Sequence, residues 1–148
     1  MLQIRRMRDC DLDQVAAIAA SVFSMPWSRQ GFAEALPMEN ACFLVASKDG
    51  EVCGYCGAYM AADEGEIINV AVDPGFQRQG IAKLLLAGLL QEGKNGGVHR
   101  FFLEVRVSNT AAICLYEKAG FQIQGIRKGF YSDNHEDAYV MNRLQEQD

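Results

Sequence analysis

The sequence has no apolar run long enough to cross a bilayer and no run of like charges. A membrane-spanning helix needs about 20 consecutive apolar residues, and Met1 to Arg6 lack the apolar stretch of a signal peptide. The net charge of −5 argues against a dedicated nucleic-acid binder, although a local basic patch stays open. We therefore expect a globular protein of the cytoplasm, with neither a membrane nor a nucleic acid as its direct partner.

Cysteine occurs in an odd number, five, without an export signal, and reduced thiols in a cytosol fit this best. Cys53 and Cys56 form a C-x-x-C motif, but they lie in a strand-like run and not at a helix N-terminus, which could lower a thiol pKa. Residues three apart in a strand face opposite sides of the sheet. The two histidines, His99 and His135, are distant in sequence. We therefore expect that Cys53 and Cys56 have a structural role and that the protein binds no metal. A redox or metal-binding role of the pair is the alternative.

The length of 148 residues fits a single domain, residues 1–148, that can bury a hydrophobic core. Periodicity and turn signals predict strands at 2–7, 42–48, 51–61, 67–73, 101–107, 121–130 and 137–144. Helices are expected at 12–23, 28–36 and 108–118, and a longer one from 81 that ends around Gly93, Gly96 and Gly97. Asp11 and Gln14 predict a capping box, and Ser28 and Ser108 are expected to cap their helices. No linker, repeat or low-complexity segment interrupts this order.

The segment that organises the sequence runs from Ile67 to Leu90, as a buried strand, a turn, a short polar loop and an apolar-faced helix. The loop 77–80 leads directly into that helix. A helix N-terminus has unpaired N–H groups and a partial positive charge, which suit a phosphate. Gly80 lets the backbone approach closely, and Arg78 and Lys83 add positive charge. The geometry suggests a pyrophosphate, with an ordinary helix entry and a solvated arginine as the alternative.

Two known phosphate-binding patterns fail here. Gly75 and Gly80 have the spacing of the mononucleotide loop, but Ile81-Ala82 follow instead of Lys-Ser or Lys-Thr, and G-x-G-x-x-G is absent. The remaining hexapeptide is Gln77-Arg78-Gln79-Gly80-Ile81-Ala82. It resembles the coenzyme A loop of the GCN5-related N-acetyltransferases (GNAT), written Q/R-x-x-G-x-G/A.

A second block, Leu103-Glu104-Val105-Arg106-x-Ser108-Asn109 continuing to Gly120-Phe121, resembles the second half of the acetyltransferase fold. There, a strand bearing a carboxylate leads into a helix bearing Asn and Tyr. Further stretches are similar to the RimI-type subfamily of ribosomal-protein-alanine N-acetyltransferases, namely Pro26-Trp27-Ser28, Asn69 to Pro74 and Glu136-Asp137-Ala138. The similarity covers essentially the whole chain.

The resemblance implies an α/β (α+β) acyl-CoA N-acyltransferase fold. Its mixed, mostly antiparallel sheet is flanked by about four helices and splays between two central parallel strands, 67–73 and 101–107. Acetyl-CoA lies in that gap. By the same resemblance the backbone of Val70, Ala71 and Val72 holds the acetyl-pantetheine arm. Asn109 and Tyr116 also contact the cofactor. The pyrophosphate is held by backbone amides of the loop and the helix start, namely those of Arg78, Gln79, Gly80, Ile81, Ala82 and Lys83.

The resemblance also makes Glu104 the general base and Tyr116 the general acid, with Trp27, Asn69 and Tyr131 as candidate substrate contacts. This chemistry is sensible on its own terms, because an α-amino group with a pKa of ~8 is largely ammonium and must lose a proton before attack. Without the resemblance, Glu104 beside Arg106 predicts a solvated ion pair. Tyr116 is then expected to be an aromatic residue of the core, and Trp27 is expected to make a buried contact between helices.

The implied activity is transfer of acetyl from acetyl-CoA to the N-terminal alanine amine of a small-subunit ribosomal protein. The alternatives are another peptide, a small amine such as a polyamine or aminoglycoside, and a non-catalytic acyl-CoA-binding module. One departure concerns Gly129-Phe130-Tyr131, where the subfamily commonly has an Asn and two tyrosines. Phe130 lacks a hydroxyl that could touch the peptide, which bears on substrate contacts and not on acetyl transfer.

Overall fold

The computed structural model describes residues 1–145 and contains a seven-stranded sheet of order β1-β2-β3-β4-β5-β7-β6. The strands are β1 (Leu2–Arg6), β2 (Ala41–Lys48), β3 (Glu51–Ala61), β4 (Glu64–Val72), β5 (Arg100–Arg106), β6 (Gln122–Arg127) and β7 (Ala138–Leu144). The helices in this part of the chain are α1 (Leu12–Val22), α2 (Arg29–Ala35), α3 (Ile81–Asn95) and α4 (Thr110–Lys118). Every strand pair is antiparallel except β4 with β5, so the predicted fold class is confirmed.

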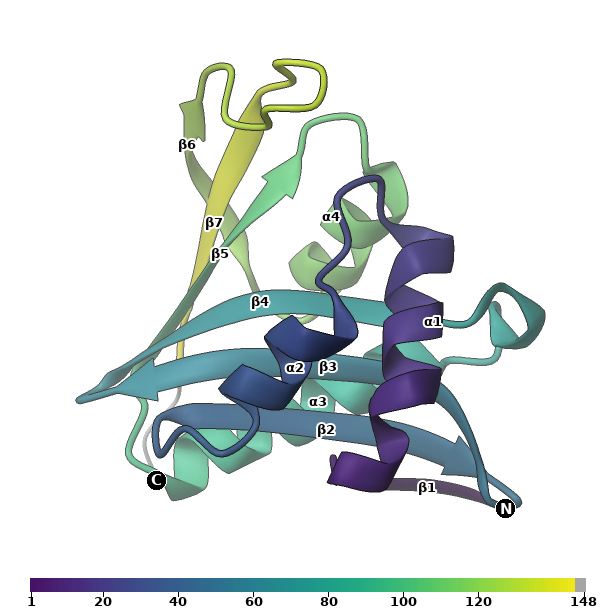
Figure 1. The fold of residues 1–148 in the computed structure, drawn as a ribbon. Helices are drawn as coiled ribbons and strands as arrows, with labels where there is room; N and C mark the ends of the chain where they lie inside the picture. The colour runs from purple at the N-terminus through teal and green to yellow at the C-terminus, as the bar shows by residue number, and fades with distance from the viewer. Residues whose placement is uncertain (146–148) are drawn as a thin grey trace.

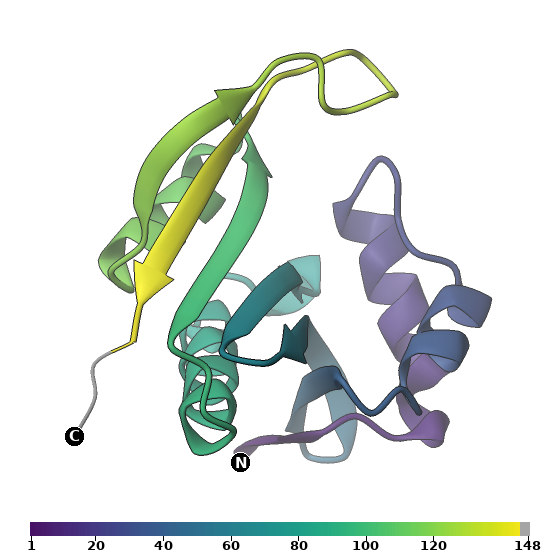
Figure 2. The same cartoon turned by 90° about the vertical axis from the view of Figure 1, so that its left-hand side faces the viewer.

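The parallel strands β4 and β5 pair at one end only. Their register joins Glu64 to Arg100, Gly65 to Phe101 and Glu66 to Phe102. Beyond these pairs β4 stays with β3, and β5 stays with β7. Figure 1 shows the two parts of the sheet diverging, and Figure 2 shows them from the side as a V. One arm of the V is β1–β4 and the other is β5, β7 and β6, as the resemblance implied.

The strand β4 begins three residues before the predicted 67, and those three residues make the parallel pairing. Glu64 to Glu66 resemble a connection because they contain a glycine between two charges. The glycine has a packing role: a Cβ at Gly65 would lie 2.5 Å from the buried ring of Phe101. A Cβ at Gly93 would lie 2.4 Å from the same ring. Gly93 lies inside α3, which ends at Asn95 with Gly96 as its C-cap, within the predicted end around Gly93, Gly96 and Gly97.

Apolar side chains cover both faces of the β1–β4 arm. On one face α3 buries Ile81, Leu85, Leu86 and Leu89, whose spacing places them on one side of the helix. On the other face α1 and α2 bury a second cluster that includes Phe32 and Tyr55. α4 lies beside the other arm of the sheet (Figures 1 and 2). The two arms are thus each supported by their own helices, which leaves the space between them open.

The helix caps match the predictions only in part. Ser28 caps α2 with its Oγ, as expected. The Asp11–Gln14 capping box is wrong, because both side chains are used in tertiary contacts. Asp11 is buried and bonds to the Arg5 guanidinium at 2.8 Å, and the Gln14 Oε1 accepts the N–H of Val52 in β3.

Cys53 and Cys56 are fully buried, free thiols in the core cluster under α3. The Cys56 Sγ donates to the carbonyl of Leu85, and the Cys53 Sγ donates to the carbonyl of Ala46. The expectation that they face opposite sides of the sheet is wrong, because a register shift at Ala46/Ser47 leaves Cys53 without a partner residue in β2. Burial raises the pKa of both thiols, which makes them unreactive.

We predict that Cys53→Ser/Cys56→Ser lowers the free energy of unfolding by about 1–3 kcal/mol per site, because each serine buries a more polar group in an apolar cluster. Acetyl transfer, the activity that the resemblance implies, should be unchanged under reducing conditions. Denaturant unfolding and a turnover assay measure the two effects, with Cys114→Ser at an exposed site as the matched control. A large loss of turnover in a well-folded double variant would show that the pair has a chemical role.

Candidate active site

A cavity of about 420 Å³ lies where β4 and β5 separate. Its walls come from the end of α1 and the loop that follows, from β4 and β5, from α4, and from the loop between β6 and β7. Of the predicted site residues it brings together Trp27, Asn69, Val70, Glu104, Asn109, Tyr116 and Tyr131. Ala71, Val72 and the loop residues 78–83 do not line it.

The edge of β4 that faces the cavity has lost its β5 partner. The N–H of Asp73 donates to the carbonyl of Cys53 in β3 at 2.8 Å. Because antiparallel pairing alternates along a strand, the N–H and C=O groups of Val70 and Val72 point the other way, toward the side that β5 has left. A register shift opposite Gly57/Ala58 adds a bulge just before this stretch. Such an edge can accept an extended ligand as an added strand.

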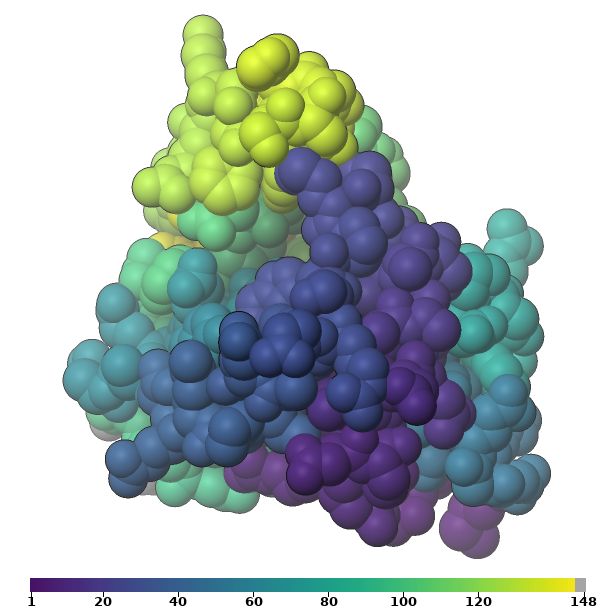
Figure 3. Space-filling model, in the orientation of Figure 1, coloured from purple at the N-terminus to yellow at the C-terminus, as the bar shows by residue number. Residues whose placement is uncertain are grey.

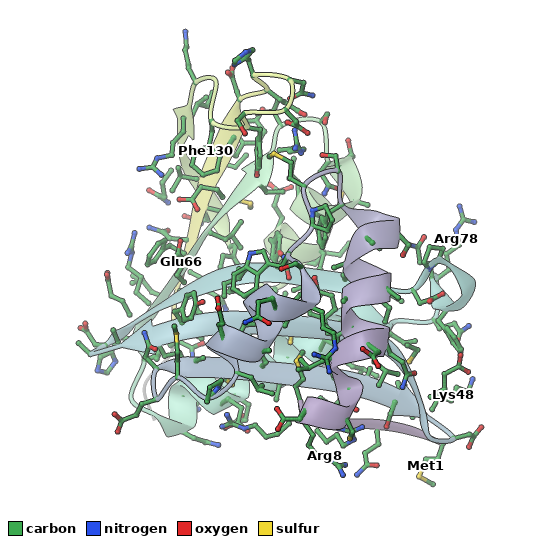
Figure 4. All side chains as sticks on the ribbon, viewed as in Figure 1. Met1, Arg8, Lys48, Glu66, Arg78 and Phe130 are labelled. Atoms are coloured by element: carbon green, nitrogen blue, oxygen red, sulfur yellow. The ribbon has the colours of Figure 1, made fainter. Side chains whose placement is uncertain are left out.

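The loop before α3 presents main-chain N–H groups to open space. The first intrahelical hydrogen bond runs from the N–H of Leu84 to the carbonyl of Gly80, so the N–H groups of residues 81–83 have no acceptor in the helix itself. Arg78 and Gly80 adopt left-handed φ angles of 66° and 75°. A Cβ at Gly80 would meet no atom within 4 Å, and the Arg78 side chain projects outward (Figure 4). This arrangement fits a pyrophosphate.

Glu104 projects from β5 into the cavity, with its side chain 17% exposed. Its ionic contact is with Arg127, whose Nη1 lies 3.5 Å from Oε2. The interpretation of Glu104 and Arg106 as an ion pair is wrong, because Arg106 binds other carboxylates. Burial raises the pKa of Glu104, the charge of Glu66 raises it further, and Arg127 lowers it. A raised pKa makes this carboxylate a stronger base.

Tyr116 lies on α4 across the cavity from β4, and only 6% of the residue is exposed. Its ring packs edge-on against Phe121, with the centroids 5.5 Å apart. It is therefore a core aromatic that also reaches the cavity wall. Burial raises the pKa of its hydroxyl, so the hydroxyl keeps its proton and can donate it.

Asn109 and Tyr116 both line the cavity, because a spacing of seven residues is about two helical turns and places them on one side of α4. Asn109 is also the N-cap of α4, because its Oδ1 accepts the N–H of Ala112 at 3.2 Å. The prediction of Ser108 as the cap is wrong: α4 begins at Thr110, and the Ser108 hydroxyl and N–H both bond to Glu136. The cap orients the Asn109 side chain at the start of the helix.

Trp27 is half-buried and packs against α2 and the sheet, and not only between helices as expected. Its ring packs against Phe32 at 5.3 Å and against Phe43 at 6.0 Å between centroids, and it also lines the cavity. Asn69 lies at the β4 bulge, where its side chain meets the buried hydroxyl of Tyr55. Tyr131 is half-buried in the loop between β6 and β7. All three thus line the cavity.

Sequence reasoning missed Ser24, Met25 and Arg106, which also line the cavity. The alternation of β5 places Arg106 on the same strand face as Glu104 and offered a signal for it. No local signal identifies Ser24 and Met25, because they reach the cavity only through the packing of α1. Within the described residues no helix is long and apolar enough to cross a membrane, and no cluster of three His, Cys, Asp or Glu could hold a metal.

Comparison with known proteins identifies the class to which this site belongs. Residues 12–121 match the model of the acetyltransferase (GNAT) family, and the chain belongs to that family. Acetyl-CoA is the acetyl donor of its members. A fold neighbour from Thermoplasma acidophilum, 19% identical with a TM-score of 0.81 over 98% of this chain and 99% of its own, is a PaiA N-acetyltransferase in complex with coenzyme A.

Several relatives carry a more specific name. The [ribosomal protein bS18]-alanine N-acetyltransferase of Escherichia coli (strain K12) is 36% identical over 143 residues, 95% of this chain and 96% of its own. A Bacillus subtilis (strain 168) protein that provisionally carries the same name is 42% identical over 140 residues, 93% of this chain and 92% of its own. The crystal structure of the ribosomal-protein-S18-alanine N-acetyltransferase from Escherichia coli has a TM-score of 0.91 and 34% identity, and covers 100% of this chain and 96% of that one.

We predict that Gly80→Val weakens acetyl-CoA binding severely and leaves the fold intact. A β-branched residue is strained at φ 75° and would fill the open space before α3 where the pyrophosphate approaches. Gly50→Val is the matched control, because Gly50 also has a positive φ of 84° and open space around its Cβ but lies in the β2–β3 turn. Calorimetry should show that Gly50→Val keeps its affinity for acetyl-CoA and that Gly80→Val loses it. Equal affinity in both variants would remove the loop from the site.

Proposed function

We propose that this protein transfers the acetyl group of acetyl-CoA to the N-terminal alanine amine of ribosomal protein bS18. The names of its relatives supply the acceptor. The observation that carries the proposal for this chain is the cavity at the open edge of β4, which Glu104 and Tyr116 both line. An acid–base pair beside an unpaired strand edge is what acetyl transfer to an amine needs.

Acetyl-CoA would bind along the open edge of β4 and the start of α3. The main chain of Val70, Ala71 and Val72 would hold the acetyl-pantetheine arm, with Val70 and Val72 offering the outward N–H and C=O groups. The amides of residues 78–83 would hold the pyrophosphate, and Arg78 and Lys83 would add positive charge. Asn109 and Tyr116 would contact the cofactor from α4. This places the acetyl group at the cavity, beside Glu104.

The site residues have separate tasks in the transfer. Glu104, directly or through a water, removes a proton from the ammonium, since only the neutral amine can attack. A C–N bond then forms, and backbone N–H groups at the β4 edge stabilise the negative charge on the carbonyl oxygen. When the C–S bond breaks, Tyr116 donates its proton to the leaving thiolate. The ammonium loses two protons in all. Glu104 takes the first before attack and later returns it to solvent. The second leaves the nitrogen of the tetrahedral intermediate and restores the proton that Tyr116 gives to sulfur, so the products are the amide and the free thiol of CoA.

The two reactants would approach from different sides. Figure 4 shows Glu66 and Phe130 on the side of the molecule opposite Arg78. The cofactor would come from the Arg78 side, and a positively charged amine would come toward Glu66 and Glu104. Phe130 is 42% exposed and is not part of the cavity lining. A hydroxyl at position 130 would therefore lie outside the cavity wall, so its absence leaves the cavity unchanged. Tyr131 would contact the acceptor.

Mass spectrometry tests the proposal directly. The protein is incubated with acetyl-CoA and a peptide copying the bS18 N-terminus, beginning with alanine and containing a lysine. We expect acetylation of the terminal amine. The same peptide with a blocked N-terminus should not be acetylated. A polyamine and an aminoglycoside serve as competing acceptors. Modification of only the lysine or only a small amine would reject the proposed acceptor, and cofactor binding without turnover would indicate a non-catalytic module.

We predict that Glu104→Gln lowers turnover by ~10²–10⁴-fold, the size of general-base catalysis, with nearly unchanged acetyl-CoA affinity. The loss should shrink at high pH, where the amine is already neutral. Tyr116→Phe should also slow turnover, but high pH should not rescue it because its proton goes to the thiolate. pH–rate profiles of both variants with the alanine peptide measure this. An equally large Glu104→Gln deficit well above the amine pKa would mean that Glu104 positions the substrate instead.

A second pH prediction concerns the charges around Glu104. Glu66 raises the pKa of Glu104 and Arg127 lowers it. Glu66→Gln should therefore move the acid limb of the kcat/KM profile to lower pH, because a lower pKa keeps Glu104 ionised further into acid. Arg127→Gln should move it to higher pH, and Arg127→Lys, which keeps the charge, should leave it near its original place. A shift of both neutralised variants in one direction would contradict Glu104 as the titrating base.

A further inference from the structure

Two loops that are distant in sequence meet at the cavity. One is residues 23–28 after α1, and the other is residues 128–137 between β6 and β7. The Ser24 Oγ donates to the Asp133 Oδ2 at 2.6 Å, and the Ser132 Oγ approaches the Met25 Sδ at 3.5 Å. Figure 3 shows the yellow β6–β7 loop in contact with the chain at the end of α1. Both loops also supply walls of the cavity, through Ser24 and Met25 on one side and Tyr131 on the other.

The Arg106 guanidinium lies at the centre of this meeting. Its Nη2 donates to the Asp133 Oδ2 at 2.8 Å and to the Ser24 Oγ at 3.2 Å, and its Nη1 donates to the Glu136 Oε1 at 3.2 Å. Its Cζ lies 3.9 Å from the centroid of the Tyr131 ring. The Arg106 side chain is only 21% exposed. A single side chain at the end of β5 therefore touches both loops and one wall of the cavity.

The partners of Arg106 are held in their charged forms. A hydrogen bond from Ser24, together with Arg106, lowers the pKa of Asp133. Hydrogen bonds from Ser108 and the contact with Arg106 likewise lower the pKa of Glu136. Because Ser108 directly precedes Asn109, the Glu136 carboxylate also fixes the loop to the start of α4. The contacts of Arg106 with the two carboxylates are charge-assisted, which makes them stronger than neutral hydrogen bonds. The contact with Glu136 is part-buried, and those with Asp133 and Ser24 are exposed.

We propose that Arg106 is a positioning residue whose contacts with Ser24, Asp133 and Glu136, together called the Arg106 clasp, hold the two loops and Tyr131 as the acceptor-binding wall of the cavity. The proposal rests on the proposed function and assigns Arg106 no part in the proton transfers. Arginine suits the task because its planar fork can bind several acceptors while it stacks on an aromatic ring. Without the clasp, the two loops would lose their shared anchor, and a peptide acceptor would meet a disordered wall.

Kinetics with two acceptors test the clasp. For Arg106→Gln we expect kcat/KM for the alanine peptide to fall by about 10- to 100-fold, as misplaced reactants do. Acetyl-CoA affinity should stay within about two-fold of the original. Alaninamide, which is too short to reach across the wall, should be acetylated nearly as before. An unchanged peptide rate, or an equal loss with both acceptors, would overturn the positioning role.

Variants of the partner residues sharpen the test. Ser24→Ala should reproduce part of the Arg106→Gln defect, and Ser24→Thr, which keeps the hydroxyl, should not. Ser24→Ala and Asp133→Ala should be non-additive in a double-mutant cycle, because they belong to one network. Arg29→Gln is the matched control, since it breaks the exposed Arg29–Asp13 ion pair that joins α1 and α2 away from the cavity. Additive losses at Ser24 and Asp133 would contradict a shared clasp.

Hydrogen exchange separates failure of the clasp from failure of the proposed function. Arg106→Gln should raise amide exchange in both loops, 23–28 and 128–137, with β2 and β3 unchanged. This readout does not depend on turnover, so it still applies if the unaltered protein fails to acetylate the bS18 peptide. Faster exchange in only one of the two loops, or in neither, would overturn the clasp.

Discussion

The structure depends on the end of the β4–β5 pairing after three residue pairs. Each strand remains bonded along its length to its other neighbour, β4 to β3 as far as Val72 and β5 to β7 as far as Arg106. The ring of Phe101, packed over Gly65 and Gly93, fixes the point at which the strands are joined. From there the arms separate, because each is supported by its own helices. The cavity and the unpaired edge of β4 are two consequences of this one divergence.

The same divergence sets the chemistry of the two proposed catalytic groups. Glu104 faces into the space between the arms from β5, and Tyr116 lines it from α4. Burial raises the pKa of both groups, but one is proposed to accept a proton and the other to donate one. The carboxylate becomes a stronger base, and the phenol becomes more firmly protonated. Arg127 and Glu66 act on Glu104 in opposite senses, so its basicity is set by charges from both arms of the sheet.

Local patterns were sufficient to predict the elements and the family, and tertiary contacts decided the rest. The resemblance predicted Glu104 of β5 as a residue of the gap between the strands, and the Gln77–Ala82 loop predicted a helix N-terminus open to a ligand. The role of Gly65 could not be predicted, because only the Phe101 ring explains why a glycine stands there. The clasp around Arg106 was equally hidden, since Ser24 and Asp133 are 109 residues apart in sequence.

Residue roles that depend on competition between neighbours were also missed. Asn109 caps α4 in place of Ser108 because the Ser108 hydroxyl, like its N–H, is already bonded to Glu136, a contact that only the fold provides. The Asp11 carboxylate likewise accepts a hydrogen bond from Arg5 and does not cap the helix as predicted. Glu104 was identified correctly as a residue of the cavity, but its ionic partner is Arg127 and not the adjacent Arg106. Such exchanges of partner cannot be predicted from spacing along one strand or helix.

The central claim is that the open edge of β4 binds the acetyl-pantetheine arm as an added strand. Residue-resolved amide hydrogen exchange, with and without acetyl-CoA, tests it most directly. The account predicts that acetyl-CoA slows exchange at Val70 and Val72, whose N–H groups point away from β3. Ala71, which alternation pairs with β3, should already be protected and serves as the internal reference. Protection at the start of α3 with unchanged exchange at Val70 and Val72 would contradict the claim.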